Sequence, residues 1–101
     1  PANYEFSFYI KAVSPENNFE FKLIDSTGTN VWWRNTRNYK FPTEWTKVKI
    51  KQRQIIFAWG TSQDGLPSKI DRIEFTIASV NGGKGTIYLD DFRFPDFCQV
   101  E

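Results

Sequence analysis

Residues 4–12 read YEFSFYIKA, and apolar side chains stand at every second position of this stretch. One face of an extended chain would carry Tyr4, Phe6, Phe8, Ile10 and Ala12, and the other would carry Glu5, Ser7, Tyr9 and Lys11. Such alternation is typical of a half-buried β-strand, because successive side chains point to opposite faces. We therefore expect a strand here with one face in the core.

The rest of the chain repeats this pattern at short intervals. Turn-forming residues are concentrated at 14–18, 25–30, 61–69 and 81–85, and a polar stretch occupies 37–43. Between them we expect strands over 19–23, 31–36, 45–51, 54–59, 70–79 and 86–94. No helical period of useful length and no internal repeat is present. Seven strands without a helix predict an all-β antiparallel β-sandwich, and 101 residues are enough for one domain, over 1–101.

Two further strands have a clear inward face. In 19–23, Phe19, Phe21 and Leu23 alternate with Glu20 and Lys22. In the fourth expected strand the inward residues are Val48 and Ile50, and the outward ones are Lys47, Lys49 and Lys51. Outward lysines protect an exposed strand against edge pairing, so the basic row has a structural explanation.

The composition excludes several kinds of chemistry. The chain has no His and one Cys, Cys98, which follows the last expected strand. An internal disulfide, the usual zinc and iron sites, and Cys/His or Ser/His catalytic pairs are therefore excluded. Glycoside hydrolysis needs two carboxylates at a defined separation in a cleft. The carboxylates of Asp90 and Asp91, which are adjacent on a strand, point in different directions and cannot act together on one glycosidic bond. We therefore expect that the chain is not an enzyme.

The charge distribution argues against nucleic acid and membranes as partners. Net charge is +1, although segment 34–53 holds seven basic residues and one acid, Glu44. No nucleic-acid-binding motif accompanies this basic segment. No apolar run approaches a membrane span and no signal peptide is present, while the abrupt start at Pro1 suggests a piece of a longer polypeptide. An acidic polysaccharide is a more credible partner for the basic segment than a nucleic acid.

Trp32 and Trp33 are consecutive on an expected strand, so their rings point to opposite faces. If Val31 is inward, as hairpin symmetry suggests, Trp33 is inward too and Trp32 is exposed on the same face as Arg34. Trp45, at a strand entry, is expected to be a core or rim plug. An exposed indole can stack on the C–H face of a sugar ring, which makes Trp32 the first candidate and Trp33 the second.

Other aromatic residues are further candidates for ligand stacking. Tyr39 lies in the polar stretch beside Arg37 and Lys40, and Trp59 precedes a glycine turn and a long loop, where it would form one wall of a site. Tyr9 and Tyr88 come close together if the first and last strands are neighbours. A single binding face would then comprise Tyr9 and Tyr88 with Glu5, Arg34, Arg72 and Glu74. Sugar hydroxyls suit such groups, but a solvated sheet with cross-strand ion pairs explains the charged members equally well.

The segment 69–94, KIDRIEFTIASVNGGKGTIYLDDFRF, resembles the closing hairpin of jelly-roll (galactose-binding-like) carbohydrate-binding modules appended to glycoside hydrolases. These often end in an I-x-x-I-x-F…G-x-G-x-(I/V)-x-(I/L/F)-D-D-(I/L/F) pattern. Segments YEFSF at 4–8 and FKLID at 21–25 fit the same order. The resemblance implies a jelly roll that binds polysaccharide, most naturally β-glucan or cellulose-type chains, in a secreted protein with an attached catalytic domain.

The chain departs from this family at its start. Modules of this kind begin with one or two further strands, the first of which lies beside the last strand, and these are absent here. We therefore expect a minimal sandwich, or one lacking N-terminal strands, whose last strand is an exposed edge that favours a homodimer. The resemblance also implies a structural calcium ion bound by Asp90. The alternative is that Asp90 and Asp91 form hydrogen bonds at a strand bulge and bind no ion.

Taken together, these observations predict a non-catalytic carbohydrate-binding module. The candidate ligand-contacting residues are Trp32, Trp33, Arg34, Tyr39, Trp59, Tyr9, Tyr88, Arg72 and Glu74. The alternative is a structural accessory sandwich of a larger multidomain protein that binds no sugar.

Overall fold

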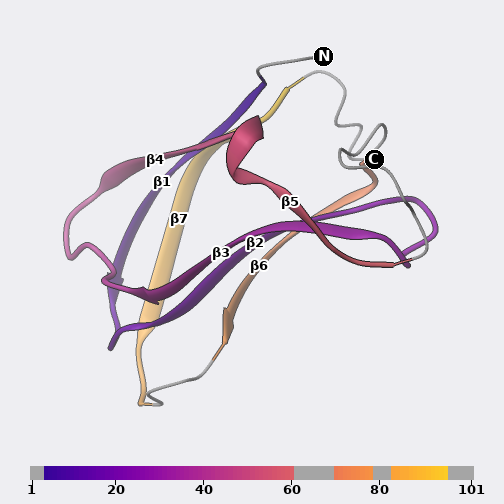
Figure 1. Ribbon diagram of the computed structural model, residues 1–101. Coiled ribbons are helices and arrows are strands. Elements are labelled where there is room, and N and C mark those ends of the chain that lie inside the picture. Colours follow the sequence, from indigo (N-terminus) through magenta and orange to yellow (C-terminus); the bar gives the residue numbers. More distant parts are fainter. Residues whose placement is uncertain (1–3, 61–69, 79–82, 96–101) are drawn as a thin grey trace.

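The computed structural model describes residues 4–60, 70–78 and 83–95. They form seven strands and one short 3-10 turn (Figure 1). The strands are β1 (Glu5–Val13), β2 (Asn17–Ile24), β3 (Val31–Tyr39), β4 (Thr46–Lys51), β5 (Ile56–Trp59), β6 (Arg72–Ala78) and β7 (Thr86–Arg93). The turn η1 (Gln52–Gln54) separates β4 from β5. Among these residues no helix has the length or apolarity needed to cross a membrane.

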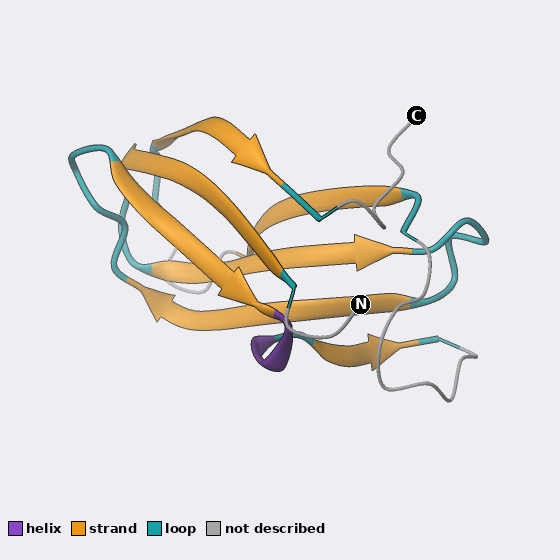
Figure 2. Ribbon diagram, turned by 90° about the horizontal axis from the view of Figure 1, so that it is seen from above, coloured by secondary structure: helices purple, strands orange, loops and turns teal. Residues whose placement is uncertain are grey.

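The strands make two antiparallel sheets, which confirms the all-β sandwich. Sheet A has the order β4-β1-β7, and sheet B has the order β5-β3-β2-β6. The first and last strands are neighbours, with Tyr9 opposite Asp90 and Lys11 opposite Tyr88. Figure 2 shows the strands of the two sheets crossing at an angle. Within the described ranges β7 pairs only with β1, so it is an edge of sheet A.

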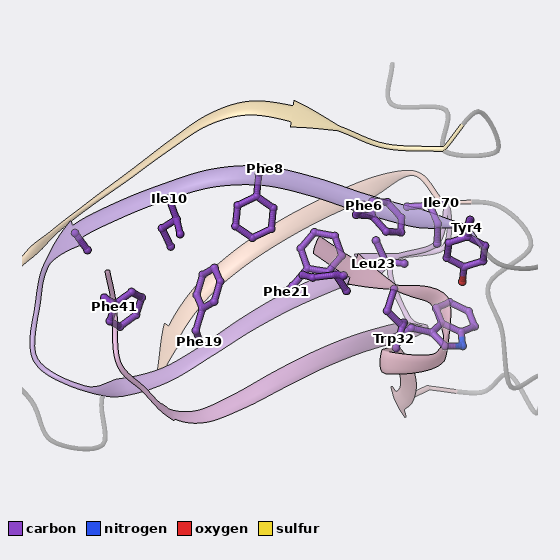
Figure 3. Packing of buried hydrophobic residues seen from close by; sticks show 13 residues of the cluster. Tyr4, Phe6, Phe8, Ile10, Phe19, Phe21, Leu23, Trp32, Phe41 and Ile70 are labelled. Carbon is purple, nitrogen blue, oxygen red and sulfur yellow. The ribbon is translucent and has the colours of Figure 1, made fainter. Parts of the chain in front are cut away.

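The apolar faces predicted for β1 and β2 meet in the core. Phe6, Phe8 and Ile10 are completely buried, and Phe21 and Leu23 face them from sheet B (Figure 3). Phe8 lies 5.0 Å from Phe75 and 6.2 Å from Phe92 between ring centroids. Burying aromatic side chains of this size supplies most of the favourable energy of a small sandwich. The hydrophobic cluster thus accounts for the large number of phenylalanines.

The loop between β2 and β3 is closed by Asp25. Its Oδ1 accepts hydrogen bonds from the hydroxyl of Thr27 at 2.6 Å and from the backbone N–H of Thr27 at 3.2 Å, and its Oδ2 accepts one from the side-chain amide of Asn30 at 2.6 Å. Burial raises the pKa of Asp25, but the hydrogen bonds from Thr27 and Asn30 outweigh it, so that pKa lies below its ordinary value. The predicted hairpin turn at 25–30 is confirmed.

Several boundaries differ from the sequence-based ones. β3 extends to Tyr39, so this tyrosine lies on a strand and not in a polar loop. Gln54 belongs to η1, where its side-chain oxygen accepts the backbone N–H of Lys51 at 2.9 Å. Trp45 was expected to plug the core or its rim, but it precedes β4 and is 45% exposed. Cys98 and the loop 61–69 lie outside the described residues.

Candidate functional site

The strand registers decide which tryptophan leaves the core. Trp32 lies opposite Leu23, and Trp33 lies opposite Lys22. Because Leu23 is completely buried in the core, Trp32 points inward, where it is 3% exposed and packs edge-to-face on Phe57 at 5.6 Å. The prediction that Trp32 is the exposed indole is therefore wrong, and Trp33 is on the outer face of sheet B.

The error came from Val31. That residue is buried, as assumed, but it lies outside the main core cluster and opposite Ile24, on the outer side of sheet B. A buried valine does not have to point into the core, because Val31 and its partner Ile24 are both buried on the outer side of sheet B. Trp32 and Arg34 do share a face, as predicted, but it is the inner face.

Trp33 and Trp59 form an aromatic pair on the outer side of sheet B. Their ring centroids lie 5.3 Å apart at an interplanar angle of 86°, an edge-to-face contact. Trp59 stands at the end of β5 and is 47% exposed, and Trp33 is half-buried. The ammonium of Lys22 lies 5.5 Å from the Trp59 ring. The pair is held in place by its neighbours and still offers indole surface to solvent.

Charged side chains continue the same surface across β2 and β6. Lys22 pairs with Glu20 at 3.3 Å, and the two side chains are only 16% and 11% exposed. Glu74 lies opposite Lys22 on β6 and pairs with Arg72 at 3.2 Å, more openly to solvent. We call this surface the tryptophan face; it comprises Glu20, Lys22, Trp33, Trp59, Arg72 and Glu74. Its charges balance.

The outer side of sheet A has a different character. Lys11 places its ammonium 5.0 Å from the Trp45 ring and 5.3 Å from the Tyr88 ring. Tyr9 lies opposite Lys47, and Lys49 and Lys51 follow along β4. We call this surface the lysine face; it comprises Tyr9, Lys11, Trp45, Lys47, Lys49, Lys51 and Tyr88. Its surplus of positive charge distinguishes it from the tryptophan face.

The single binding face expected from the sequence does not exist. Tyr9 and Tyr88 are on the outer side of sheet A, whereas Arg72 and Glu74 are on the outer side of sheet B. Arg34 lies opposite Phe21 and therefore points between the sheets. The pairing of the first and last strands brings Tyr9, Tyr88 and Glu5 to the outer side of sheet A. Arg34, Arg72 and Glu74 do not join them, because these three belong to the other layer of the sandwich.

Glu20 and Lys22 were missed as candidates, although their outward direction was predicted correctly. Their importance depends on β2 lying between β3 and β6, which places Lys22 beside both Trp33 and Glu74. The sequence signal was the pair of outward charges on a strand whose other face is fully apolar. Without the strand order nothing connected that pair with the tryptophans.

The acidic pair at the end of β7 forms a bulge. Asp91 has φ 48°, and its backbone N–H donates to Asp90 Oδ1 at 2.8 Å. Asp91 Oδ1 accepts from Arg93 at 3.3 Å. In the described part of the chain no group of three acidic, His or Cys side chains gathers to hold a metal. Calcium needs six to eight oxygens, so these residues alone do not make its site, and calcium at Asp90 stays a prediction.

Comparison with known proteins adds no family to this picture. No protein-family model, curated protein or solved structure gives a significant match to the chain.

Proposed function

We propose that this chain is a non-catalytic carbohydrate-binding module whose tryptophan face binds a neutral polysaccharide of the β-glucan or cellulose type. The observation that carries the proposal is the Trp33–Trp59 pair, two indoles in mutual contact outside the core of the sandwich. A protein this small buries large aromatic groups where it can, so an exposed pair of them is a functional candidate.

The chemistry of the surface around the pair suits a sugar chain. An indole offers a flat apolar surface to the axial C–H groups of a pyranose ring, and carboxylates and guanidinium groups hydrogen-bond to hydroxyls. Glu74 and Arg72 lie on β6, across β2 from the pair on the same side of sheet B, and are half-exposed, so they are accessible to a ligand. Because the charges of the tryptophan face balance, a neutral polysaccharide fits it better than an acidic one.

The resemblance of segment 69–94 to modules appended to glycoside hydrolases supports the same proposal. It supplies the wider context: a secreted enzyme whose separate catalytic domain is kept near plant cell-wall polysaccharide by this module. The affinity for polysaccharide should be modest, because the entropy lost when the polysaccharide chain and the protein side chains become ordered offsets much of the contact energy.

Affinity electrophoresis tests the site directly. The wild-type protein should be retarded in native gels containing soluble β-glucan, and Trp33→Ala or Trp59→Ala should remove the retardation. Trp45→Ala is the matched control, because Trp45 is about as exposed as Trp59 but belongs to the lysine face. Loss of retardation in Trp45→Ala with retention in Trp33→Ala would move the site to sheet A. A reducing-sugar assay on the same polysaccharides should show no release.

A second candidate function rests on a different surface. Between β6 and β7 the inward-facing side chains Ile77 and Leu89 are 37% and 40% exposed, and Phe94 beyond β7 is 44% exposed. We call this the β6–β7 seam. Apolar groups at an open sheet edge favour packing against another domain, as in a structural accessory sandwich. Absence of retardation by β-glucan, xyloglucan, xylan, mannan and pectin, together with no binding to insoluble cellulose, would favour this function.

A further inference from the structure

The two sheets separate along the side of the sandwich opposite the β6–β7 seam. A cleft of about 260 Å³ opens there between β2 and β3 of sheet B and β4 of sheet A. Its lining residues are Phe19, Phe21, Arg34, Thr36, Tyr39, Thr46, Lys47, Val48 and Ile50. Val48 and Ile50 face inward from β4, while the side chain of Lys47 alternates toward the lysine face. The cleft therefore has an apolar floor.

Among the described residues, Arg34 is the one cation whose strand register directs it into this cleft. It lies opposite Phe21, which is 1% exposed, so both side chains are on the inner face of sheet B. No carboxylate lines the cleft, and Arg34 makes no ion pair within the described ranges. A half-buried guanidinium beside apolar groups has lost part of its hydration without gaining a protein partner. An anionic ligand would supply that partner.

Two hydroxyl groups stand near this guanidinium. Tyr39 is fixed by stacking on Phe19 at 5.4 Å and by an edge contact to Phe41 at 4.9 Å. Burial raises the pKa of Tyr39, opposed by the positive charge of Arg34, so its hydroxyl stays a neutral donor at physiological pH. Thr36 adds a second hydroxyl from β3. Neither forms a hydrogen bond within the described part of the chain, so both can bind a ligand.

We propose that the cleft between β3 and β4 binds one uronic acid unit, with its carboxylate on the guanidinium of Arg34. The planar fork of an arginine matches a carboxylate with two parallel hydrogen bonds. The hydroxyls of the sugar reach Thr36 and Tyr39, and its C–H face lies on the apolar floor. The volume of the cleft equals that of roughly nine liquid waters, room for a single sugar ring and not for a chain of them.

This site is independent of the tryptophan face. It lies between the sheets and not on the outer side of sheet B, and it selects a charged sugar. A failure of β-glucan binding therefore leaves the uronic acid site standing, and the reverse also holds.

An NMR titration of the ¹⁵N-labelled protein with methyl β-glucuronide tests the proposal, with methyl β-glucoside as the neutral match. The glucuronide should shift the amide signals of Thr36, Tyr39 and Val48 saturably. The glucoside should bind at least about tenfold more weakly, because it leaves the guanidinium without a partner. Sodium acetate at equal concentration should compete weakly, since it has the carboxylate without the ring.

Variants of β3 complete the test. Arg34→Gln should weaken glucuronide binding at least about tenfold, and Arg34→Lys should lie between it and wild type, because lysine keeps the charge but lacks the fork. Arg37→Gln is the matched control, an exposed arginine on the same strand that does not line the cleft. Arg34→Lys also serves if Arg34→Gln does not fold. Equal shifts by glucuronide and glucoside, wild-type binding in Arg34→Gln, or no saturable shift at the cleft would each overturn the proposal.

Discussion

Replacing the two adjacent tryptophans by alanine, one at a time, should separate stability from binding. Trp32→Ala should mainly lower the free energy of unfolding, whereas Trp33→Ala should mainly remove polysaccharide binding. Trp32 is 3% exposed in the core, whereas Trp33 is half-buried on the tryptophan face. Removing a buried tryptophan costs about 3–5 kcal/mol in free energy of unfolding, through lost burial and the cavity left behind. For Trp32→Ala we expect about 4 kcal/mol, because it also ends the contact with Phe57.

Trp33→Ala should cost much less. Its edge-to-face contact with Trp59 contributes about 0.5–1.5 kcal/mol, and partial burial brings the expected loss to about 1–2 kcal/mol. With a urea dependence of about 1.5 kcal/mol per molar, the unfolding midpoint should fall by roughly 2–3 M for Trp32→Ala and by about 1 M for Trp33→Ala. Only the second variant should lose β-glucan retardation while remaining folded.

Urea unfolding followed by far-ultraviolet circular dichroism measures both costs, since fluorescence would change with the removal of either indole. A small domain has only about 5–15 kcal/mol of stability, so Trp32→Ala can approach complete unfolding. Trp32→Phe then keeps the comparison measurable, with an expected loss smaller than that of Trp32→Ala. Equal costs for the two alanine variants, or a larger cost for Trp33→Ala, would refute the assignment of Trp32 to the inner face.

Four other perturbations test separate parts of the structure. Gly60→Ala should destabilise the protein by at least about 2 kcal/mol, because Gly60 has φ 137° and an added Cβ would clash with Asn30 and lie 2.5 Å from the Thr29 carbonyl oxygen. A thermal unfolding midpoint equal to that of the wild type would contradict this. The pKa of Asp25 is lower in the folded than in the unfolded state, so its stabilisation is present above the unfolded value and is lost as pH falls through the folded one. Asp25→Asn should therefore flatten the fall in stability as the pH drops below the ordinary aspartate pKa of about 4, and parallel acid profiles would argue against it. If Asp90 binds calcium, the melting temperature of the wild-type protein should rise with calcium chloride and fall with a chelator, and that of Asp90→Asn should do neither. A wild-type melting temperature that does not change with calcium would contradict a calcium site at Asp90. The edge position of β7 predicts a concentration-dependent homodimer in analytical ultracentrifugation that Leu89→Lys weakens, and a monomer at every concentration would show that the β6–β7 seam does not pair copies of the chain.

Periodicity was sufficient for the strands whose two faces differ in polarity. In β1 and in residues 19–23 of β2 apolar and polar side chains alternate in the sequence, and their apolar sets form the core as predicted. It failed for β3, where Val31, Trp32 and Trp33 are all apolar and alternation has no preferred phase. A one-residue change of phase exchanges the two faces of a strand, which is why the two tryptophans were assigned in reverse.

The candidate sites depend on strand order, which local sequence does not contain. Lys22 neighbours Trp33 and Glu74 only because β2 lies between β3 and β6. Trp59 joins them from β5, whose pairing with β3 required the chain to cross between the sheets. Tyr9 and Tyr88 share a face because β1 pairs with β7, a pairing that could be stated from the sequence only as a condition.

The sequence by itself determined that this protein is an antiparallel β-sandwich with a phenylalanine-rich core, because alternation along a strand is a local property of the chain. It also determined which residue types are available for binding, namely tryptophan, tyrosine and charged side chains, without histidine or a second cysteine. Tertiary structure alone decided which of these residues share a surface: Trp33 with Trp59 outside sheet B, Lys11 between Trp45 and Tyr88 outside sheet A, and Arg34 between the sheets. The physical reason is that a surface is made by strands distant in the chain, and their pairing minimises the exposed area of the whole core at once.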